Sequence, residues 1–105
     1  MSINTSRKGT GFELAVAERL EAGGYVVGSR RHVAGPGDLV AWKCDRPPLL
    51  VECKRGSGSP YENFRPGDRA ALRDYAAARG LVPLLAWRKD RGRLAFIDAA
   101  EWPTG

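Results

Sequence analysis

The first regular pattern of apolar and polar residues predicts an amphipathic helix over 12–22. At the helical period of about 100° per residue, one face of this segment is apolar, and it consists of Phe12, Val16, Ala17 and Leu20. Glu13 falls within the same face, so we expect its carboxylate to point inward. Thr10 is the expected N-cap, and Gly23 with Gly24 ends the helix.

Short apolar runs bounded by turn residues predict the other elements. Strands are expected over 25–29, 38–43, 49–54, 81–88 and 93–98, and a second helix over 68–79. The connection 44–48 makes the second and third strands an antiparallel hairpin, whereas the Gly-, Ser- and Pro-rich segment 55–67 is long for so small a domain. The order α-β-β-β-α-β-β predicts one α/β (α+β) domain over 1–105, with a mixed five-stranded sheet and two flanking helices.

The stretch LLVECKRG, residues 49–56, places a carboxylate and an ammonium at the end of an apolar strand. Glu52 and Lys54 emerge on one face, because alternate strand residues point to the same side. A register in which Val40 faces Glu52 would bring Asp38 close to Lys54, so these charged groups are expected to converge. They would lie at one end of an apolar surface formed by Val40, Trp42 and Leu50.

Two neighbouring carboxylates repel one another unless a cation lies between them. Because Mg²⁺ takes oxygen ligands and needs few protein carboxylates, Asp38, Glu52 and the backbone carbonyl of Cys53 form a candidate metal site. Lys54 beside that metal would orient an attacking water and offset charge on a phosphate, which suits phosphodiester hydrolysis. The alternative is an ordinary surface salt bridge that involves Lys54 and contributes about 0 to 1 kcal/mol.

The composition, with 43% hydrophobic residues among 105, is that of a globular domain, and the formal net charge of +5 favours nucleic acid as a partner. A solvated basic surface is the alternative. No apolar run reaches the length of a membrane span and no signal peptide is evident, so we expect a cytoplasmic protein with no membrane or small-molecule partner. Cys44 and Cys53 are expected to be apolar fillers, and a single histidine, His32, supports neither a zinc cluster nor a catalytic triad.

These motifs, in this order and spacing, resemble the PD-(D/E)XK nuclease superfamily, and within it the archaeal-type Holliday junction resolvases, which also occur in viruses. Asp38 and Glu52-Cys53-Lys54 match the core motif of the superfamily. The resemblance runs nearly end to end, through 7–9, 13, 25–27, 37–41, 51–54 and 82–86. It implies a restriction-endonuclease-like core and Mg²⁺-dependent cleavage of four-way DNA junctions, with Mn²⁺ able to substitute, in the host cytoplasm if the gene is viral.

The resemblance also implies individual roles. Asp38 and Glu52 would bind the metal, Lys54 would be the catalytic lysine, and Glu13 would point toward the site as a catalytic group and a further candidate ligand. Glu13 also fits a capping box with the Thr10 amide, although its place in the apolar face favours the inward role. Family members commonly carry a serine in the loop before the aspartate, but the loop 30–37 has none. Either the preceding Ser29 takes this role or the role is absent.

Basic residues around the site would contact DNA phosphates, because branched DNA is recognised by its shape more than by its base sequence. The expected contacts are Arg7, Lys8, Arg30, Arg31, Arg55, Arg65 and Arg69. His32 is either a further phosphate contact or a solvated loop residue. Tyr61 and Phe64 either stack on DNA near the crossover or pack within the domain.

Resolution of a junction needs two symmetric cuts, and one short chain supplies one site, so a twofold homodimer is expected. The last two strands are apolar on both faces, with Leu85, Trp87, Leu94 and Phe96 expected on one face and Leu84, Ala86 and Ile97 on the other. Either a partner packs on one of these faces, or the helices and the Trp102 tail cover them.

Two other functions fit the same sequence. One is a superfamily nuclease that acts on duplex, flap or end structures, although so short a chain, with no added recognition domain, argues against base-specific recognition. The other is a non-catalytic basic module that binds nucleic acid and needs no convergence of Asp38, Glu52 and Lys54.

Overall fold

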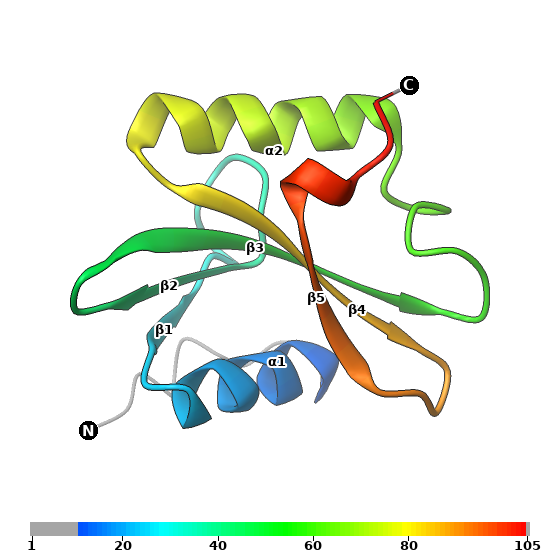
Figure 1. The fold of residues 1–105 in the computed structure, drawn as a ribbon, viewed down its shortest axis with the longest axis horizontal. Helices are drawn as coiled ribbons and strands as arrows, with labels where there is room; N and C mark the ends of the chain where they lie inside the picture. Colours follow the sequence, from blue (N-terminus) through cyan, green and yellow to red (C-terminus); the bar gives the residue numbers. More distant parts are fainter. Residues whose placement is uncertain (1–10, 105) are drawn as a thin grey trace.

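The computed structural model describes residues 11–104, whose elements follow the predicted order (Figure 1). The helices are α1 (Gly11–Ala22) and α2 (Pro66–Arg79), and a short 3₁₀ helix, η2, covers Ala99–Glu101. The strands are β1 (Val26–Ser29), β2 (Leu39–Lys43), β3 (Arg46–Gly56), β4 (Val82–Lys89) and β5 (Leu94–Asp98). The predicted α+β fold is confirmed. Within the described residues, neither helix is long and apolar enough to cross a membrane.

The five strands form one mixed sheet whose spatial order, β1-β2-β3-β4-β5, follows the chain. Only β3 and β4 are parallel; the other neighbours are antiparallel. Parallel strands need a long crossover, and α2 with the loop before it supplies that crossover. The C-terminal ends of β3 and β4 therefore lie together at one end of the sheet, where Lys54 pairs with Trp87 and Arg55 with Arg88.

Two elements begin two or more residues before their predicted start, for local reasons. Strand β3 begins at Arg46, not at residue 49, because the turn needs only Cys44 and Asp45. Asp45 has a φ of 67°, and aspartate tolerates this left-handed region better than most residues. Helix α2 begins at Pro66, since proline suits the first turn of a helix. The carboxylate of Asp68 then accepts a hydrogen bond from the Arg65 amide at 3.1 Å, which closes the N-terminus.

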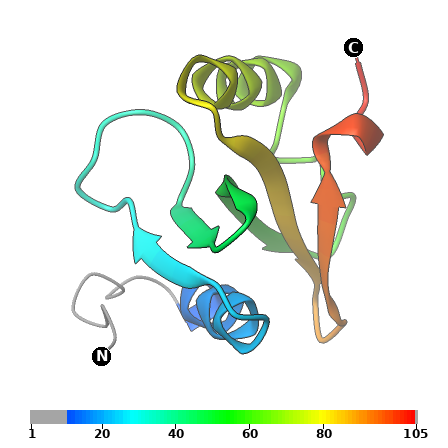
Figure 2. The same cartoon turned by 60° about the vertical axis from the view of Figure 1, so that its left-hand side comes forward.

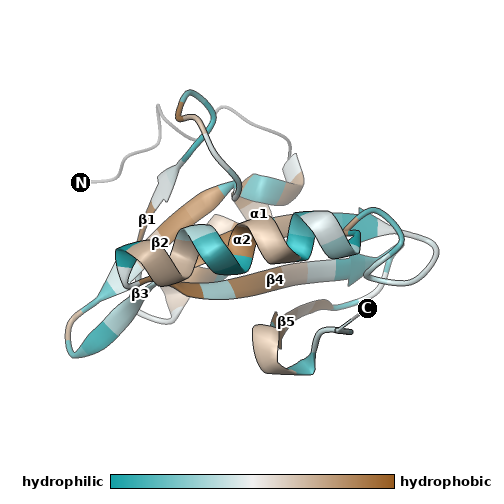
Figure 3. Ribbon diagram, turned by 90° about the horizontal axis from the view of Figure 1, so that it is seen from above, coloured by the Kyte–Doolittle hydropathy of each residue, from teal (hydrophilic) through white to brown (hydrophobic). Residues whose placement is uncertain are grey.

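The two helices cover opposite faces of the sheet (Figures 1 and 2). An apolar cluster lies between the sheet and each helix. The buried residues on the α1 side are Phe12, Val16, Ala17, Leu20, Val27, Leu39, Ala41, Val51 and Ala86. Those on the α2 side are Leu50, Phe64, Leu72, Ala76, Leu85 and Trp102. Figure 3 shows apolar residues along the middle of β4 beneath α2 and polar residues at its C-terminal end. The charged ends of the central strands thus emerge directly from both cores.

The β4–β5 pair has different faces from those predicted. Ala86 pairs with Phe96 and Leu85 with Ile97, so Phe96 belongs to the α1 side and not to the face of Trp87. The predicted grouping of Leu94 and Phe96 with Leu85 and Trp87 is wrong, because the antiparallel register pairs residues of equal parity. On the α2 side the chain end packs over these strands, and its Trp102 is only 3% exposed. The two faces are therefore largely covered within the chain, the alternative to a partner subunit.

Candidate active site

The β2–β3 hairpin brings Asp38 opposite Glu52. Val40 pairs with Leu50, and the same register continued places Asp38 directly across from Glu52. The predicted register, with Val40 facing Glu52 and Asp38 facing Lys54, is wrong by two residues. The cause is the short turn together with a bulge between residues 41 and 43. A shift of two residues leaves every side chain on its predicted face, so the charged groups still converge.

The apolar surface beside this site is smaller than predicted. Leu50 is fully buried and Val40 is half-buried, but Trp42 lies at the bulge and is 44% exposed. Trp42 pairs with Val26 of β1, which is 52% exposed. These two side chains form an exposed apolar patch on the first two strands.

Asp38 is held by backbone hydrogen bonds on both sides. Its amide donates to the carbonyl of Val51 at 2.8 Å, and its carbonyl accepts from the amide of Arg30 at 2.9 Å. Its carboxylate Oδ2 accepts a hydrogen bond from the amide of Cys53 at 2.8 Å. The Asp38 carboxylate thus accepts a hydrogen bond that a backbone carbonyl would accept if the β2–β3 ladder continued. Its orientation is therefore fixed relative to β3.

Two glycines allow the loop before Asp38 to lie close to the sheet and to α2. Gly37 has a φ of 94°, and a Cβ there would lie 2.6 Å from Leu50 Cδ1. Gly35 has a φ of 106°, and a Cβ there would lie 2.7 Å from the Tyr75 ring. Both the backbone angle and the space exclude an ordinary side chain. The Gly37 amide in turn donates a hydrogen bond to the Glu52 carboxylate.

The carboxyl groups of the site resist ionisation. Burial is the main cause that raises the pKa of Asp38, and the Cys53 hydrogen bond and Lys54 only partly offset it. Burial and then the charge of Asp38 raise the pKa of Glu52, against the opposing effect of Lys54. Burial and the charge of Asp38 also raise the pKa of Glu13. A cation placed between these groups would remove the repulsion that the free site contains.

Lys54 Nζ lies 3.5 Å from Glu52 Oε2, and the two side chains are 29% and 17% exposed. This ion pair is the surface salt bridge that the sequence left open as the alternative to a metal site. It coexists with the convergence of carboxylates, because the ammonium sits beside Glu52 at the open end of the strand. Solvent screening keeps the contribution of such a pair to stability to about 1 kcal/mol or less.

A hollow in the surface contains these groups. Its walls come from the glycine loop, the ends of β2 and β3, and the first turns of α2, and they comprise Gly35, Pro36, Gly37, Asp38, Glu52, Lys54, Asp68 and Ala71. A second hollow shares Lys54 and lies on the α1 side, lined by Phe12, Glu13, Cys53, Lys54, Arg55 and Asn63. Glu13 therefore reaches the same end of the sheet as predicted, and its charge interacts with that of Asp38.

The oxygen donors at the site suit a hard divalent cation. The amide of Cys53 points toward Asp38, and the carbonyl of a strand residue points to the same side as its amide, so the Cys53 carbonyl is directed past the start of β2. Together with Asp38 and Glu52 it offers two carboxylates and one carbonyl, a set that fits Mg²⁺ with several retained waters. No group of three or more His, Cys, Asp or Glu side chains within 11–104 is arranged to hold a metal.

Two of the residues predicted to act at the site, Ser29 and Arg30, have structural partners. The Ser29 hydroxyl accepts a hydrogen bond from the Arg31 amide at 3.2 Å, and Ser29 does not line the carboxylate hollow. Arg30 packs over the Tyr75 ring at 4.9 Å and donates to the Ala34 carbonyl at 3.1 Å, so it anchors the loop. Arg31 is exposed and electrostatically close to Glu13. His32 is also exposed, and the predicted Arg7, Lys8 and the Thr10 cap lie outside the described residues.

The loop between β3 and α2 is held by packing. Phe64 is 1% exposed and meets Trp102 edge to face at 4.9 Å, so its packing role is confirmed. Arg69 is 4% exposed and donates to the Phe64 carbonyl, with its guanidinium 5.5 Å from the half-buried Tyr61 ring. The expected phosphate contact of Arg69 is therefore wrong, because its charged group is buried beneath the loop. Arg55 and Arg65 are exposed.

Two contributions to the site escaped the sequence interpretation. Asp68 and Ala71 complete the carboxylate hollow from α2, whereas the sequence predicts Asp68 only as the first residue of a helix. The Arg30–Tyr75 contact fixes the glycine loop against the same helix. The helical period does place Asp68, Ala71 and Tyr75 on one face, but nothing in the sequence indicates that this face meets the loop.

No protein-family model matches the chain, and no curated protein matches it in sequence. Among solved structures, the fold matches that of Hjc, a Holliday junction resolvase from the archaeal hyperthermophile Archaeoglobus fulgidus. The TM-score is 0.67 at 20% sequence identity, over 89% of this chain and 74% of that one. At this identity the match shows the fold alone, and it agrees with the resolvase-like architecture predicted from the sequence.

Proposed function

We propose that this chain is a structure-selective, metal-dependent endonuclease that resolves four-way DNA junctions by paired phosphodiester hydrolysis. The carrying observation is the placement of Asp38 opposite Glu52, with Lys54 3.5 Å from Glu52, at the open end of the central strands. The shared fold with a Holliday junction resolvase supports the choice of substrate. The net charge of +5 supports nucleic acid as the partner.

In this proposal Asp38, Glu52 and the Cys53 carbonyl hold Mg²⁺, for which Mn²⁺ substitutes. When bound, the metal polarises a phosphoryl oxygen and lowers the pKa of its water. Lys54 orients the attacking water and offsets the charge that develops on the phosphate. Glu13, from the α1 side, holds water or a proton at the same end of the sheet.

Exposed basic residues around these hollows would contact phosphates, and they include Arg31, Arg55 and Arg65. A cytoplasmic homodimer would supply the two active sites that a junction requires. The exposed apolar pair Val26 and Trp42 is the surface that best suits a second copy. Trp87 and Phe96, which lie on the strand faces where the sequence allowed a partner, instead pack against the two cores of the domain.

The test is cleavage and binding by Asp38→Ala, Glu52→Ala and Lys54→Ala, measured with a synthetic four-way junction and a linear duplex of the same sequence. Cleavage in Mg²⁺ should be confined to the junction and fall by at least about 100-fold in each variant. Junction binding in EDTA should survive, and it should tighten when a carboxylate is removed from beside the phosphates. Folding should survive as well, because these side chains lie at strand ends and not in the cores.

Asp74→Ala, a change on the exposed side of α2, is the matched control and should cut normally. Equal cutting of duplex and junction would exclude junction selectivity but retain a nuclease. Near-normal cutting by any one of the three variants would remove that residue from the mechanism. Binding without metal-dependent cutting by the wild-type chain would leave a non-catalytic binding module.

A further inference from the structure

Three hollows follow one another at the C-terminal ends of β3 and β4. Lys54 lines both the carboxylate hollow and the α1-side hollow that contains Glu13. Arg55 lines that second hollow and also a third one at the β4–β5 turn. The walls of the third hollow are Arg55, Arg88, Asp90, Arg91 and Gly92. Consecutive residues of β3 therefore connect the carboxylates to a cluster of arginines.

Two arginines of the third hollow lie side by side on neighbouring strands. Arg55 pairs with Arg88 in the parallel β3–β4 ladder, so both side chains project from the same face. Like charges in this position repel, and an anion between them removes the repulsion. The guanidinium of Arg88 lies 5.2 Å from the centre of the Phe12 ring, and this contact holds the side chain in place. Across the described part of the chain, neither arginine forms an ion pair.

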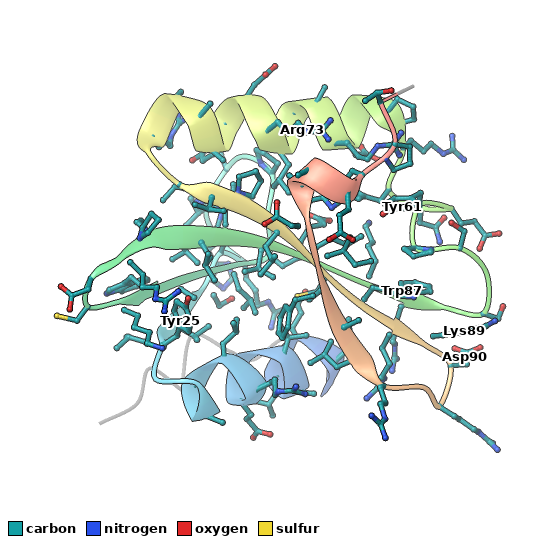
Figure 4. The ribbon with its side chains drawn as sticks, in the orientation of Figure 1. Tyr25, Tyr61, Arg73, Trp87, Lys89 and Asp90 are labelled. Carbon is teal, nitrogen blue, oxygen red and sulfur yellow. The ribbon has the colours of Figure 1, made fainter. Side chains whose placement is uncertain are left out.

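The third arginine is presented by a strained turn. Arg91 has a φ of 59°, a left-handed conformation that favours glycine or asparagine. The turn is closed by the Gly92 amide, which donates to the Lys89 carbonyl at 2.6 Å, and it is tied to β3 by the Asp90 amide, which donates to the Gly56 carbonyl at 3.0 Å. Figure 4 shows Lys89 and Asp90 at this turn. A long cationic side chain thus occupies a position that the backbone would favour for glycine.

We propose that Arg55, Arg88 and Arg91 form a phosphate-binding site for the DNA backbone beyond the scissile position. The proposal rests on the proposed nuclease function, since the site is placed along the path that leaves the carboxylates. Arginine suits this task because its guanidinium binds phosphate oxygens in pairs. The phosphate to be cut meets carboxylates and a metal, whereas the phosphates that follow it meet arginines without an intervening metal.

The experiment uses three test variants: Arg91→Gly, Arg88→Gln and the double variant that carries both changes. Arg46→Gln is the control variant. Arg46 is exposed at the other end of β3, nine residues and therefore about 30 Å from Arg55, and its loss removes the same charge. Junction affinity is measured in EDTA over a series of salt concentrations, and thermal unfolding is measured on the same samples. Cleavage in Mg²⁺ by the wild-type chain is measured in parallel.

We expect the double variant to bind the junction about tenfold more weakly, with a salt slope reduced by about 1 for each lost phosphate contact. Arg91→Gly should unfold at the same or a higher temperature than the wild type, because it relieves the left-handed strain while it weakens binding. Arg46→Gln should change neither affinity nor slope.

If Arg88→Gln and Arg91→Gly bind like Arg46→Gln while the wild type cuts junctions, the arginine site is refuted and the nuclease proposal stands. Equal weakening in all the variants would show a general effect of net charge and would also refute the site. If the wild type neither binds nor cuts junctions, the proposed function fails first, and this site fails with it.

Discussion

Replacement of Asp38 by asparagine should stabilise the metal-free protein while it abolishes cleavage. The carboxylate is partly buried opposite Glu52, and burial raises its pKa above the ordinary value. Asparagine has the same shape, and its carbonyl oxygen can still accept the hydrogen bond from the Cys53 amide. The substitution therefore removes the buried charge without leaving that amide unpaired.

The pH dependence follows from the direction of the shift. A carboxyl group whose pKa is raised by folding stabilises the protein fully below its unfolded pKa, and this contribution is lost as the pH rises through the folded pKa. At pH 7 the wild type has lost it, whereas the asparagine variant has no charge to bury at any pH. The advantage of the variant should thus be present at pH 7 and should shrink as the pH falls toward about 4.

The expected gain at pH 7 is about 1 kcal/mol, the low end of the cost of burying a polar group, because the carboxylate keeps part of its solvation and its hydrogen bond from the Cys53 amide. For a domain of this size the melting temperature would rise by about 4 to 8 °C. Thermal unfolding in EDTA at pH 7 and at pH 4 measures the effect, with Asp74→Asn on the exposed side of α2 as the control.

Addition of Mg²⁺ should reverse the order of stability. A ligand that binds only the native state stabilises it, and the variant has lost one of the two carboxylates that would bind the metal. A melting temperature for Asp38→Asn below that of the wild type in EDTA at pH 7 would refute the claim that the buried charge of Asp38 destabilises the metal-free protein. Equal stabilisation of both proteins by Mg²⁺ would refute Asp38 as a ligand.

Two further changes test the loop and the oligomeric state. Gly37→Ala should lower the free energy of unfolding by about 1 to 3 kcal/mol, because a Cβ there meets Leu50 and the φ of 94° is unfavourable. Denaturant unfolding measures this effect, and an unchanged midpoint would contradict it. Trp42→Glu should shift the protein from dimer toward monomer in light scattering, whereas Val33→Glu in the exposed loop should not. A wild-type protein that is monomeric at concentrations where both strands of a junction are cut would contradict the dimer.

The sequence was sufficient to predict the fold because its local patterns agree with one another. The apolar face of 12–22, the short hairpin and the alanine-rich second helix each have one compatible place beside a mixed sheet. The predicted convergence of Asp38, Glu52 and Lys54 survived an incorrect register because the error was two residues, and such a shift leaves each side chain on its predicted face.

The remaining errors concern what the periodicity of one element cannot determine. The length of the turn at Cys44 and Asp45 depended on a left-handed aspartate, and this decided which residue faces Glu52. Arg69 is buried because the segment before α2 packs over it, with the Phe64 carbonyl as a hydrogen-bond partner. The periodicity of α2 alone does not indicate that this segment covers it. Arg91 was visible as a basic residue, but its strained φ and its common hollow with Arg55 exist only in three dimensions.

The site stands directly on the core, and this separates its chemistry from its stability. Leu50 and Val51 are fully buried on opposite faces of β3, and Glu52 is the next residue. The position of Glu52 is therefore set by two apolar clusters that do not depend on its charge, so the fold can tolerate a carboxylate that resists ionisation. A site held by a mobile loop could relieve the repulsion between its carboxylates by moving them apart, whereas strands fixed by buried neighbours cannot. The repulsion between Asp38 and Glu52 can therefore be relieved by a bound cation or a proton but not by movement of the strands, which is why we expect Mg²⁺ to raise the melting temperature of the wild type.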